Sequence, residues 1–224
     1  MREPIFEAIK AARGKGFTQP EVDKIDALLT SLGVPGASGK GFANMEAFWS
    51  GVRKVTGPLD SVQSDIVTRL LKEAGEWGNG WLAYALATAW HESRLKPIEE
   101  WGKGKGKKYG AVNSTGKAPY GRGLVQLTWH DNYVRADKEL NLGGALAKDY
   151  NLALRPDIAV QIMVRGMEEG WFTGKSLASY IGAGLGTEPE FVNARRVING
   201  TDKAALIAGY AVKFQDALIA GGRA

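Results

Sequence analysis

The stretch WLAYALATAWHESRLKPIEEW, Trp81–Trp101, runs from almost uninterrupted apolar residues into three carboxylates. Its first half, up to Glu92, is apolar on nearly every side of a helix, which predicts a central helix that is buried all round. This helix cannot continue through Pro97, because a proline pushes the residue before it out of the helical region. We therefore expect a buried helix that ends in charge, and a turn that brings Glu99 and Glu100 back toward its end.

Helical patterns also cover much of the remaining chain. The capping box TQPE at 18–21 opens a helix that apolar residues continue to Leu32, before Gly33 ends it. A second capping box, TWHD at 128–131, opens another helix, in which Trp129 is assigned to packing. Further helices are predicted at 61–74, 156–170, 188–198 and 203–220.

Glycine-rich segments divide these helices. Segment 33–44, GVPGASGKGFAN, has the composition of a hinge, so we place a boundary there between an N-terminal helical segment with its hinge (1–44) and a larger domain (45–224). Gly102 to Gly123 holds seven glycines and five lysines, which predicts a long basic loop with a small β-hairpin at most. No alternation of strands and helices indicates a parallel sheet. The sequence predicts a mainly α fold.

The charge balance narrows the partners. The chain has 29 Lys and Arg against 24 Asp and Glu, a formal net charge of +5, which favours a polyanionic partner such as nucleic acid or a cell envelope. Nucleic acid is the poorer choice, because the lysines crowd one glycine-rich loop instead of a recognition helix. The absence of cysteine excludes disulfides and thiolate chemistry.

The N-terminal sequence MREPIFEAIKAARGKGF lacks the apolar core of a secretory signal, and no apolar run reaches the length of a membrane span. We therefore expect synthesis in the cytoplasm, with no stable insertion into a membrane. No heptad or repeat asks for a second copy, so a monomer is expected.

Most common catalytic motifs are missing. The chain has two histidines, His91 and His130, and HESRL lacks the second histidine of a zinc helix, so no metal is expected. No Gly-x-Ser-x-Gly elbow is present, and GKGKGKK is not a phosphate loop, because it lacks the strand before it and the Lys-Ser or Lys-Thr pair after it. No cofactor is expected.

The remaining candidates for catalytic groups are the carboxylates of Glu92, Glu99 and Glu100. At the C-terminal end of an apolar helix, the helix dipole and the neighbouring Trp90 both favour a protonated Glu92, the form that a general acid needs. In a continuous helix Glu100 would lie about 12 Å further along the axis, too far for a glycosidase pair. A turn at Pro97 removes that obstacle. Spacing alone favours a simpler interpretation, in which Glu92 is a solvated helix end and Glu99 and Glu100 are surface charges.

Other residues allow two interpretations. His91 is either a hydrogen-bonded structural histidine or part of a site. The aromatic residues Trp101, Tyr109 and Tyr120, in or beside the basic loop, are candidates to stack on sugar rings. Gln126, Thr128 and Asn199 are polar among apolar neighbours, which suits hydrogen bonds to a sugar or to the backbone. Arg122, Arg195 and Arg196 are consistent with ordinary surface charges.

Three segments carry a family resemblance. In chain order they are ATAWHESRLKPIEEWGKGKGKKYG (87–110), PYGRGLVQLTWHDNY (119–133) and FVNARRVINGTDKAALIAGYAVKF (191–214). Together they resemble the chitinase-like glycoside hydrolases of family 19, in the branch that includes phage and prophage endolysins. The part from Tyr120 to Tyr133 is the most specific, and it favours a catalytic Glu92 over a solvated helix end.

The resemblance implies a lysozyme-like, two-lobed fold with a groove for a β-1,4-linked amino-sugar polymer, cleaved by hydrolysis with inversion. Glu92 then matches the general acid and Glu100 the base that activates water. Glu99 is the alternative base, because the interval after Glu92 is about one residue shorter than the family pattern. The predicted substrate-binding residues are His91, Tyr109, Tyr120, Arg122, Gln126, Thr128 and Asn199.

These expectations lead to an endolysin that cleaves peptidoglycan between N-acetylmuramic acid and N-acetylglucosamine. Such an enzyme acts on the cell wall after leaving the cytoplasm through the pore of a partner protein, a holin. The alternatives are a chitinase, a lytic transglycosylase and a non-catalytic wall-binding protein. Segment 1–44 is either a wall anchor or a helical layer on the catalytic domain.

Overall fold

The computed structural model describes residues 3–14, 21, 24–25, 28, 41–114 and 116–223. Most of the predicted helix at 18–32 and most of the hinge at 33–44 lie outside these residues. The described helices are α1 (Glu3–Arg13), α3 (Met45–Thr56), α4 (Ser61–Glu73), α5 (Asn79–Ser93), α6 (His130–Glu139), α7 (Ala145–Lys148), α8 (Pro156–Glu169), α9 (Glu188–Ala194) and α10 (Ala204–Ala220). Short 3-10 turns are η1 (Lys108–Gly110), η2 (Tyr150–Leu154), η3 (Leu177–Ser179) and η4 (Arg195–Val197).

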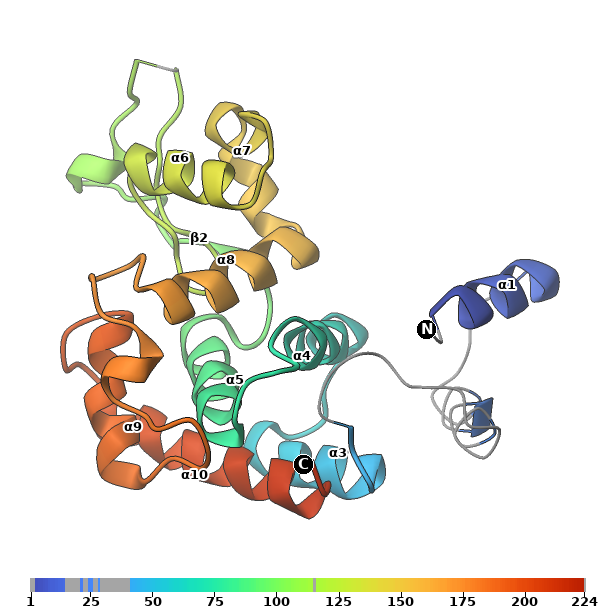
Figure 1. The fold of residues 1–224 in the computed structure, drawn as a ribbon. Coiled ribbons are helices and arrows are strands. Elements are labelled where there is room, and N and C mark those ends of the chain that lie inside the picture. Colours follow the sequence, from blue (N-terminus) through green and yellow to red (C-terminus); the bar gives the residue numbers. More distant parts are fainter. Residues whose placement is uncertain are drawn as a thin grey trace.

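The body of the molecule has two lobes (Figure 1). The lower lobe in that view contains α3, α5, α9 and α10, and the upper lobe contains α6, α7 and the strands β1 (Ile98–Glu99) and β2 (Arg122–Gly123). Helices α4 and α8 pack against each other between them. The prediction of a mainly α, lysozyme-like fold with one small hairpin is confirmed.

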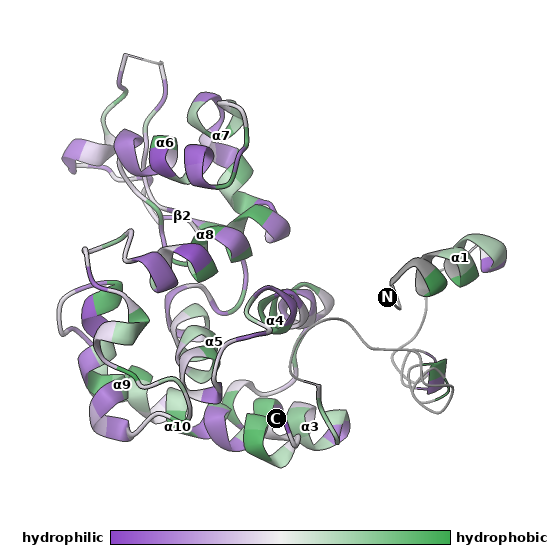
Figure 2. Ribbon diagram, viewed as in Figure 1, coloured by the Kyte–Doolittle hydropathy of each residue, from purple (hydrophilic) through white to green (hydrophobic). Residues whose placement is uncertain are grey.

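Helix α5 is the centre of the core. It packs against α10, α4 and α8, and nearly all of its residues from Gly80 to Ala89 are buried. Figure 2 shows it mostly pale or green, whereas the surface helix α6 is largely hydrophilic. The predicted helix at 81–92 is therefore confirmed, with an earlier start at Asn79. Burial on every side leaves the C-terminal end as the place where this helix can carry charge.

Three sequence predictions need correction or extension. Helix α6 begins at His130 without a side-chain cap, because its N-cap residue is Trp129, whose indole cannot accept a hydrogen bond, so the predicted capping box is wrong. The predicted helix at 188–198 is divided, since α9 ends at Ala194 and the tighter turn η4 follows. The sequence patterns also do not predict α1, α3 or α7.

Within the described residues, every helix is too short or too polar to cross a membrane.

A buried arginine ties the end of the described chain to the core. Arg223 is 5% exposed, and its guanidinium donates to the carbonyl oxygens of Gly75 at 2.8 Å and Trp77 at 3.0 Å and to Asn79 Oδ1 at 2.7 Å. The two carbonyls lie in the turn between α4 and α5, and Asn79 is the first residue of α5. Arg223 therefore fixes the start of α5.

We expect Arg223→Ala to lower the free energy of unfolding by about 2–4 kcal/mol, because it leaves several buried carbonyls without a donor. Urea denaturation measures this loss. Arg53→Ala, which removes an exposed ion pair with Glu46, is the control and should cost about 0–1 kcal/mol. Equal losses in both variants would contradict the role assigned to Arg223.

Candidate active site

The chain leaves α5 by a left-handed turn. Arg94 and Leu95 have φ values of 54° and 57°, and the Leu95 N–H donates to the Ala89 carbonyl at 3.1 Å. Leu95 is fully buried and anchors the turn in the core. The helix therefore ends before Pro97, and the prediction that the proline makes this turn is wrong. No glycine marks the position, so the sequence holds no ordinary signal for it.

Glu92 lies on the last turn of α5 and forms an ion pair across the lower lobe. Arg195 Nη1 donates to Glu92 Oε1 at 2.5 Å, and Arg195 Nε donates to the Asp202 carbonyl at 2.9 Å. The Arg195 side chain is 3% exposed and that of Glu92 is 20% exposed. Arg195 is thus no surface charge, which corrects the sequence interpretation. The ion pair fixes the position of the Glu92 carboxyl group at the end of α5.

Sequence reasoning could not distinguish Arg195 from its neighbour Arg196, which is exposed and donates to Asn193 Oδ1. Only the tight turn η4, after α9, directs one of the two side chains inward.

His91, beside Glu92 on α5, is half-buried. Burial lowers its pKa, with Glu92 acting in the opposite direction and Arg195 in the same one. His91 is therefore neutral at physiological pH.

Glu99 and Glu100 lie at the strand pair β1–β2. This pair is antiparallel, with Ile98 opposite Gly123 and Glu99 opposite Arg122. The Glu100 N–H extends it by donating to the Gly121 carbonyl at 2.7 Å. Successive side chains of an extended chain point to opposite faces, so the two carboxylates have different surroundings.

Glu99 is bonded to side chains on both of its oxygens. Tyr120 Oη donates to Oε1, and Lys103 Nζ lies 3.2 Å from Oε2. The hydrogen bond from Tyr120, together with Lys103, lowers the pKa of Glu99. Glu99 is accordingly a weaker base than an ordinary glutamate.

Glu100 is held differently. Tyr109 Oη donates to Oε1 at 3.0 Å, and the Gly121 N–H donates to Oε2 at 3.0 Å. A Cβ added at Gly121 would come within 3.2 Å of Glu100 Cβ and 2.9 Å of Gln126 Oε1. Glu100 and Gln126 therefore flank Gly121 on one face, and the predicted groove residue lies beside the predicted base.

Gln126 has a φ of 55° at the turn between Arg122 and Leu127, which form an antiparallel bridge. Its Nε2 donates to the carbonyls of Ile98 at 3.2 Å and Gly123 at 3.3 Å. The side chain thus joins the turn to β1.

Arg122 and Tyr120 are buried, at 5% and 8% exposed. The Arg122 guanidinium lies 3.6 Å from the centre of the Tyr120 ring and donates to Asn151 Oδ1 and to the Tyr120 carbonyl. The sequence suggested that Arg122 is a surface charge, and its burial shows that this interpretation is wrong. Both side chains bond to the protein, and their direct contact with a substrate stays a prediction.

Of the three aromatic residues near Glu100, Tyr109 is half-buried and the two tryptophans are exposed. Trp101 is 99% exposed, and Trp129 is 47% exposed with its ring 5.6 Å from that of Tyr109, edge to face. The assignment of Trp129 to packing in the core is therefore wrong. Trp101, Tyr109 and Trp129 are available for stacking on sugars.

Asn199 and Thr128 belong to different lobes. Asn199 is exposed one turn after Arg195, to whose carbonyl its N–H donates at 2.9 Å, so it lies near the Glu92 ion pair. Thr128 is half-buried before α6, and its carbonyl accepts from Asn132 Nδ2 at 2.9 Å. The structure thus gathers the predicted residues into two clusters, one around Glu92 and one around Glu100.

The chain resembles chitinases in sequence and in fold. No protein-family model matches the chain. Two endochitinases of Arabidopsis thaliana are similar in sequence, one 32% identical over 102 residues (45% of this chain, 34% of the relative) and one 33% identical over 90 residues (40% and 29%). The matched part thus spans about a third of the length of these relatives.

The crystal structure of chitinase C from Streptomyces griseus HUT6037 has the same fold, with a TM-score of 0.53 and 20% identity over 77% of this chain and 75% of that one. The chain is chitinase-like in sequence and in fold.

The ion pair between Glu92 and Arg195 can be tested by mutation. A double-mutant cycle of Glu92→Gln and Arg195→Met should give a coupling energy of about 1–3 kcal/mol, because either single change leaves a partly buried polar group without its partner. The exposed pair Arg53 and Glu46 should give about 0.2–1 kcal/mol in the same assay. Coupling no larger than this control would contradict the buried ion pair.

The lowered pKa of Glu99 makes stability depend on pH. Because its pKa is lowered in the folded protein, its hydrogen bonds add stability above the unfolded pKa, and that stability is lost as the pH falls through the folded pKa. Tyr120→Phe should therefore raise the pKa of Glu99 and destabilise the protein at neutral pH but not in acid. Carboxyl NMR titration measures the shift. Tyr109→Phe, which acts on Glu100, is the matched control, and an unmoved Glu99 titration in Tyr120→Phe would contradict this cause.

Proposed function

We propose that this protein is a glycoside hydrolase that cleaves β-1,4 bonds of an amino-sugar polymer by acid–base catalysis with inversion. The observation that carries the proposal is the pair of carboxylates: Glu92 held by Arg195 at the end of α5, and Glu100 held by Tyr109 and the Gly121 N–H after β1. The similarity to endochitinases supports the same chemistry.

Glu92 acts as the general acid. It gives its proton to the bridging oxygen as the glycosidic bond breaks, and becomes a carboxylate. Arg195 Nη1, 2.5 Å from Oε1, stabilises the negative charge that develops in this step. Arg195 is accordingly a positioning residue, because it acts through Glu92.

Glu100 acts as the general base. It takes a proton from the water that attacks the anomeric carbon on the face opposite the leaving oxygen, which inverts that carbon. The hydrogen bonds from Tyr109 and Gly121 fix the direction of the carboxylate. Glu99 is the poorer candidate, because its pKa is lowered and because Tyr120 and Lys103 hold it.

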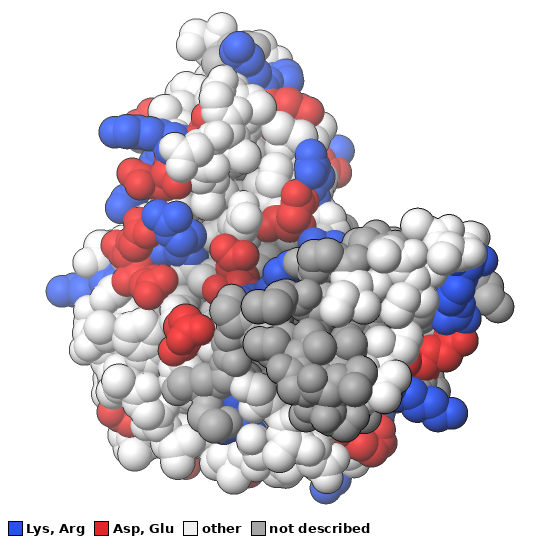
Figure 3. Space-filling view, turned by 45° about the vertical axis from the view of Figure 1, so that its right-hand side comes forward, with Lys and Arg blue, Asp and Glu red and all other residues white. Residues whose placement is uncertain are grey.

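For the polymer we propose peptidoglycan, cut between N-acetylmuramic acid and N-acetylglucosamine. The net charge of +5 supports an anionic polymer. On the face in Figure 3, acidic and basic side chains are interspersed, so the excess of positive charge does not gather there in one patch. Action on the cell wall, release through a holin pore and a wall-anchoring or layer role for 1–44 belong to the same proposal.

Chitin is the second candidate, because both sequence relatives are named endochitinases. Digesting peptidoglycan and N-acetylglucosamine hexamers side by side, with mass spectrometry of the new ends, separates the two. Reducing muramic acid ends are expected. Cleavage of the hexamer alone would replace peptidoglycan by chitin, anhydro-muramic ends would indicate a lytic transglycosylase, and no cleavage would leave a binding protein.

Carboxamide variants test the roles of the three glutamates. Glu92→Gln and Glu100→Gln should each lower kcat by about 10²–10⁴-fold, the usual contribution of a general acid or base. Glu99→Gln, the matched control on the neighbouring residue, should lower kcat by less than about tenfold. A larger loss in Glu99→Gln than in Glu100→Gln would transfer the base to Glu99.

A further inference from the structure

The basic loop beside Glu100 has a defined backbone. In this lysine loop, Gly102–Lys108, the N–H of Lys103 donates to the Glu100 carbonyl at 2.9 Å, that of Lys105 to Gly102 at 2.9 Å and that of Lys107 to Gly104 at 2.8 Å. The three glycines 102, 104 and 106 have φ values of 79°, 69° and 78°, which other residues rarely adopt. Alternating glycine and lysine therefore builds a chain of successive turns.

Contacts at both ends fix this loop to the candidate active site. At its start, Lys103 pairs with Glu99 at 3.2 Å. Near its end, Tyr109 bonds to Glu100 at 3.0 Å. Between them the backbone closes on itself, since a Cβ added at Gly110 would lie 1.9 Å from the Gly104 carbonyl oxygen. The backbone that carries the lysines is thus fixed next to Glu100.

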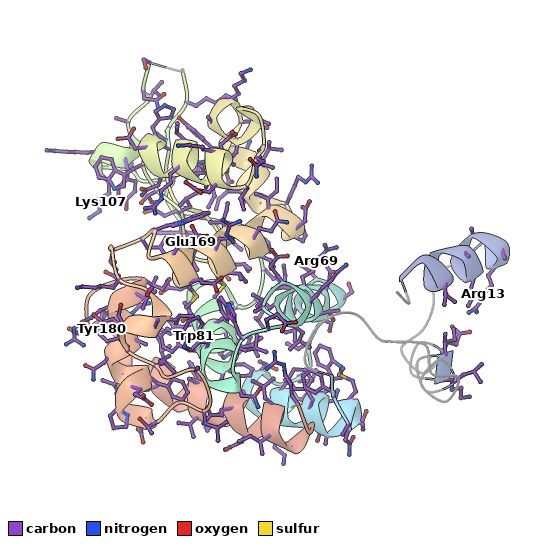
Figure 4. The ribbon with its side chains drawn as sticks, in the orientation of Figure 1. Arg13, Arg69, Trp81, Lys107, Glu169 and Tyr180 are labelled. Atoms are coloured by element: carbon purple, nitrogen blue, oxygen red, sulfur yellow. The ribbon has the colours of Figure 1, made fainter. Side chains whose placement is uncertain are left out.

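Three of these lysines have no carboxylate partner among the described residues. Lys105, Lys107 and Lys108 are exposed, whereas Lys96 and Lys103 form ion pairs at 2.5 Å and 3.2 Å. Figure 4 shows Lys107 at the margin of the upper lobe. Three like charges within four residues repel one another, and no described carboxylate within ion-pair distance offsets this repulsion. An anionic ligand would offset that repulsion.

We propose that Lys105, Lys107 and Lys108 form a subsite for the carboxylates of the peptide stems that peptidoglycan carries on its muramic acid residues. This inference rests on the proposed function, since it explains how that site would prefer peptidoglycan to neutral chitin. Ammonium groups on flexible stems suit carboxylates in variable positions, because they act as point charges without fixed geometry. Binding at the loop holds the glycan strand beside Glu100.

The test compares Lys105→Gln/Lys107→Gln/Lys108→Gln with a control of equal charge, Lys54→Gln/Lys175→Gln/Lys213→Gln, whose lysines are also exposed. Co-sedimentation with peptidoglycan sacculi, freed of phosphate polymers, measures binding at low and high salt. The loop variant should bind about tenfold more weakly at low salt and equally at high salt, because exposed charge pairs are screened. The ratio of kcat/KM for peptidoglycan to that for the N-acetylglucosamine hexamer should fall by about the same factor.

Equal weakening in the control variant would overturn the subsite, because net charge alone would then explain binding. Weakening only on sacculi that retain their phosphate polymers would overturn the assignment to carboxylates. An unchanged ratio of the two kcat/KM values would overturn the role in specificity. A wild-type protein that cleaves neither polymer would contradict the proposed function, while sedimentation would still decide whether the loop binds peptidoglycan.

Discussion

A helix that is buried on every side can carry charge only at its end, and that constraint organises this molecule. Helix α5 packs against α10, α4 and α8, and its one carboxylate, Glu92, lies in the last turn. Glu92 emerges there, where Arg195 meets it from the turn after α9. One ion pair thus joins the central helix to the segment that also carries Asn199.

The strand pair β1–β2 gives Glu99 and Glu100 different surroundings. Two adjacent carboxylates cannot share one environment in an extended chain, because their side chains alternate. Glu99 is bound by Tyr120 and Lys103. Glu100 accepts hydrogen bonds from Tyr109 and from the Gly121 N–H, and it lies beside Gln126. Next to both carboxylates, the loop carries three lysines that form no ion pair with the described carboxylates. These lysines connect the catalytic proposal to the choice of polymer.

The sequence patterns correctly predicted the features that depend on the spacing of apolar residues along the chain. The buried helix, the charged end at Glu92, the mainly α fold and the small hairpin follow from apolar spacing and glycine content. Features that depend on long-range contacts or on helix caps could not be predicted in this way. The inward orientation of Arg195, and not of Arg196, depends on a tertiary contact. The turn at Arg94 and Leu95 carries no glycine, and the exposure of Trp129 has no signal in the helical pattern.

The anomeric form of the first product tests the central claim most directly. If Glu92 protonates the leaving oxygen while water activated by Glu100 attacks the opposite face, a β-linked strand must release α-configured reducing ends. Time-resolved proton NMR of the digest, read before the anomers equilibrate, should record the α form first. Initial release of the β form would mean a retaining mechanism, and would contradict the assignment of Glu100 as the base.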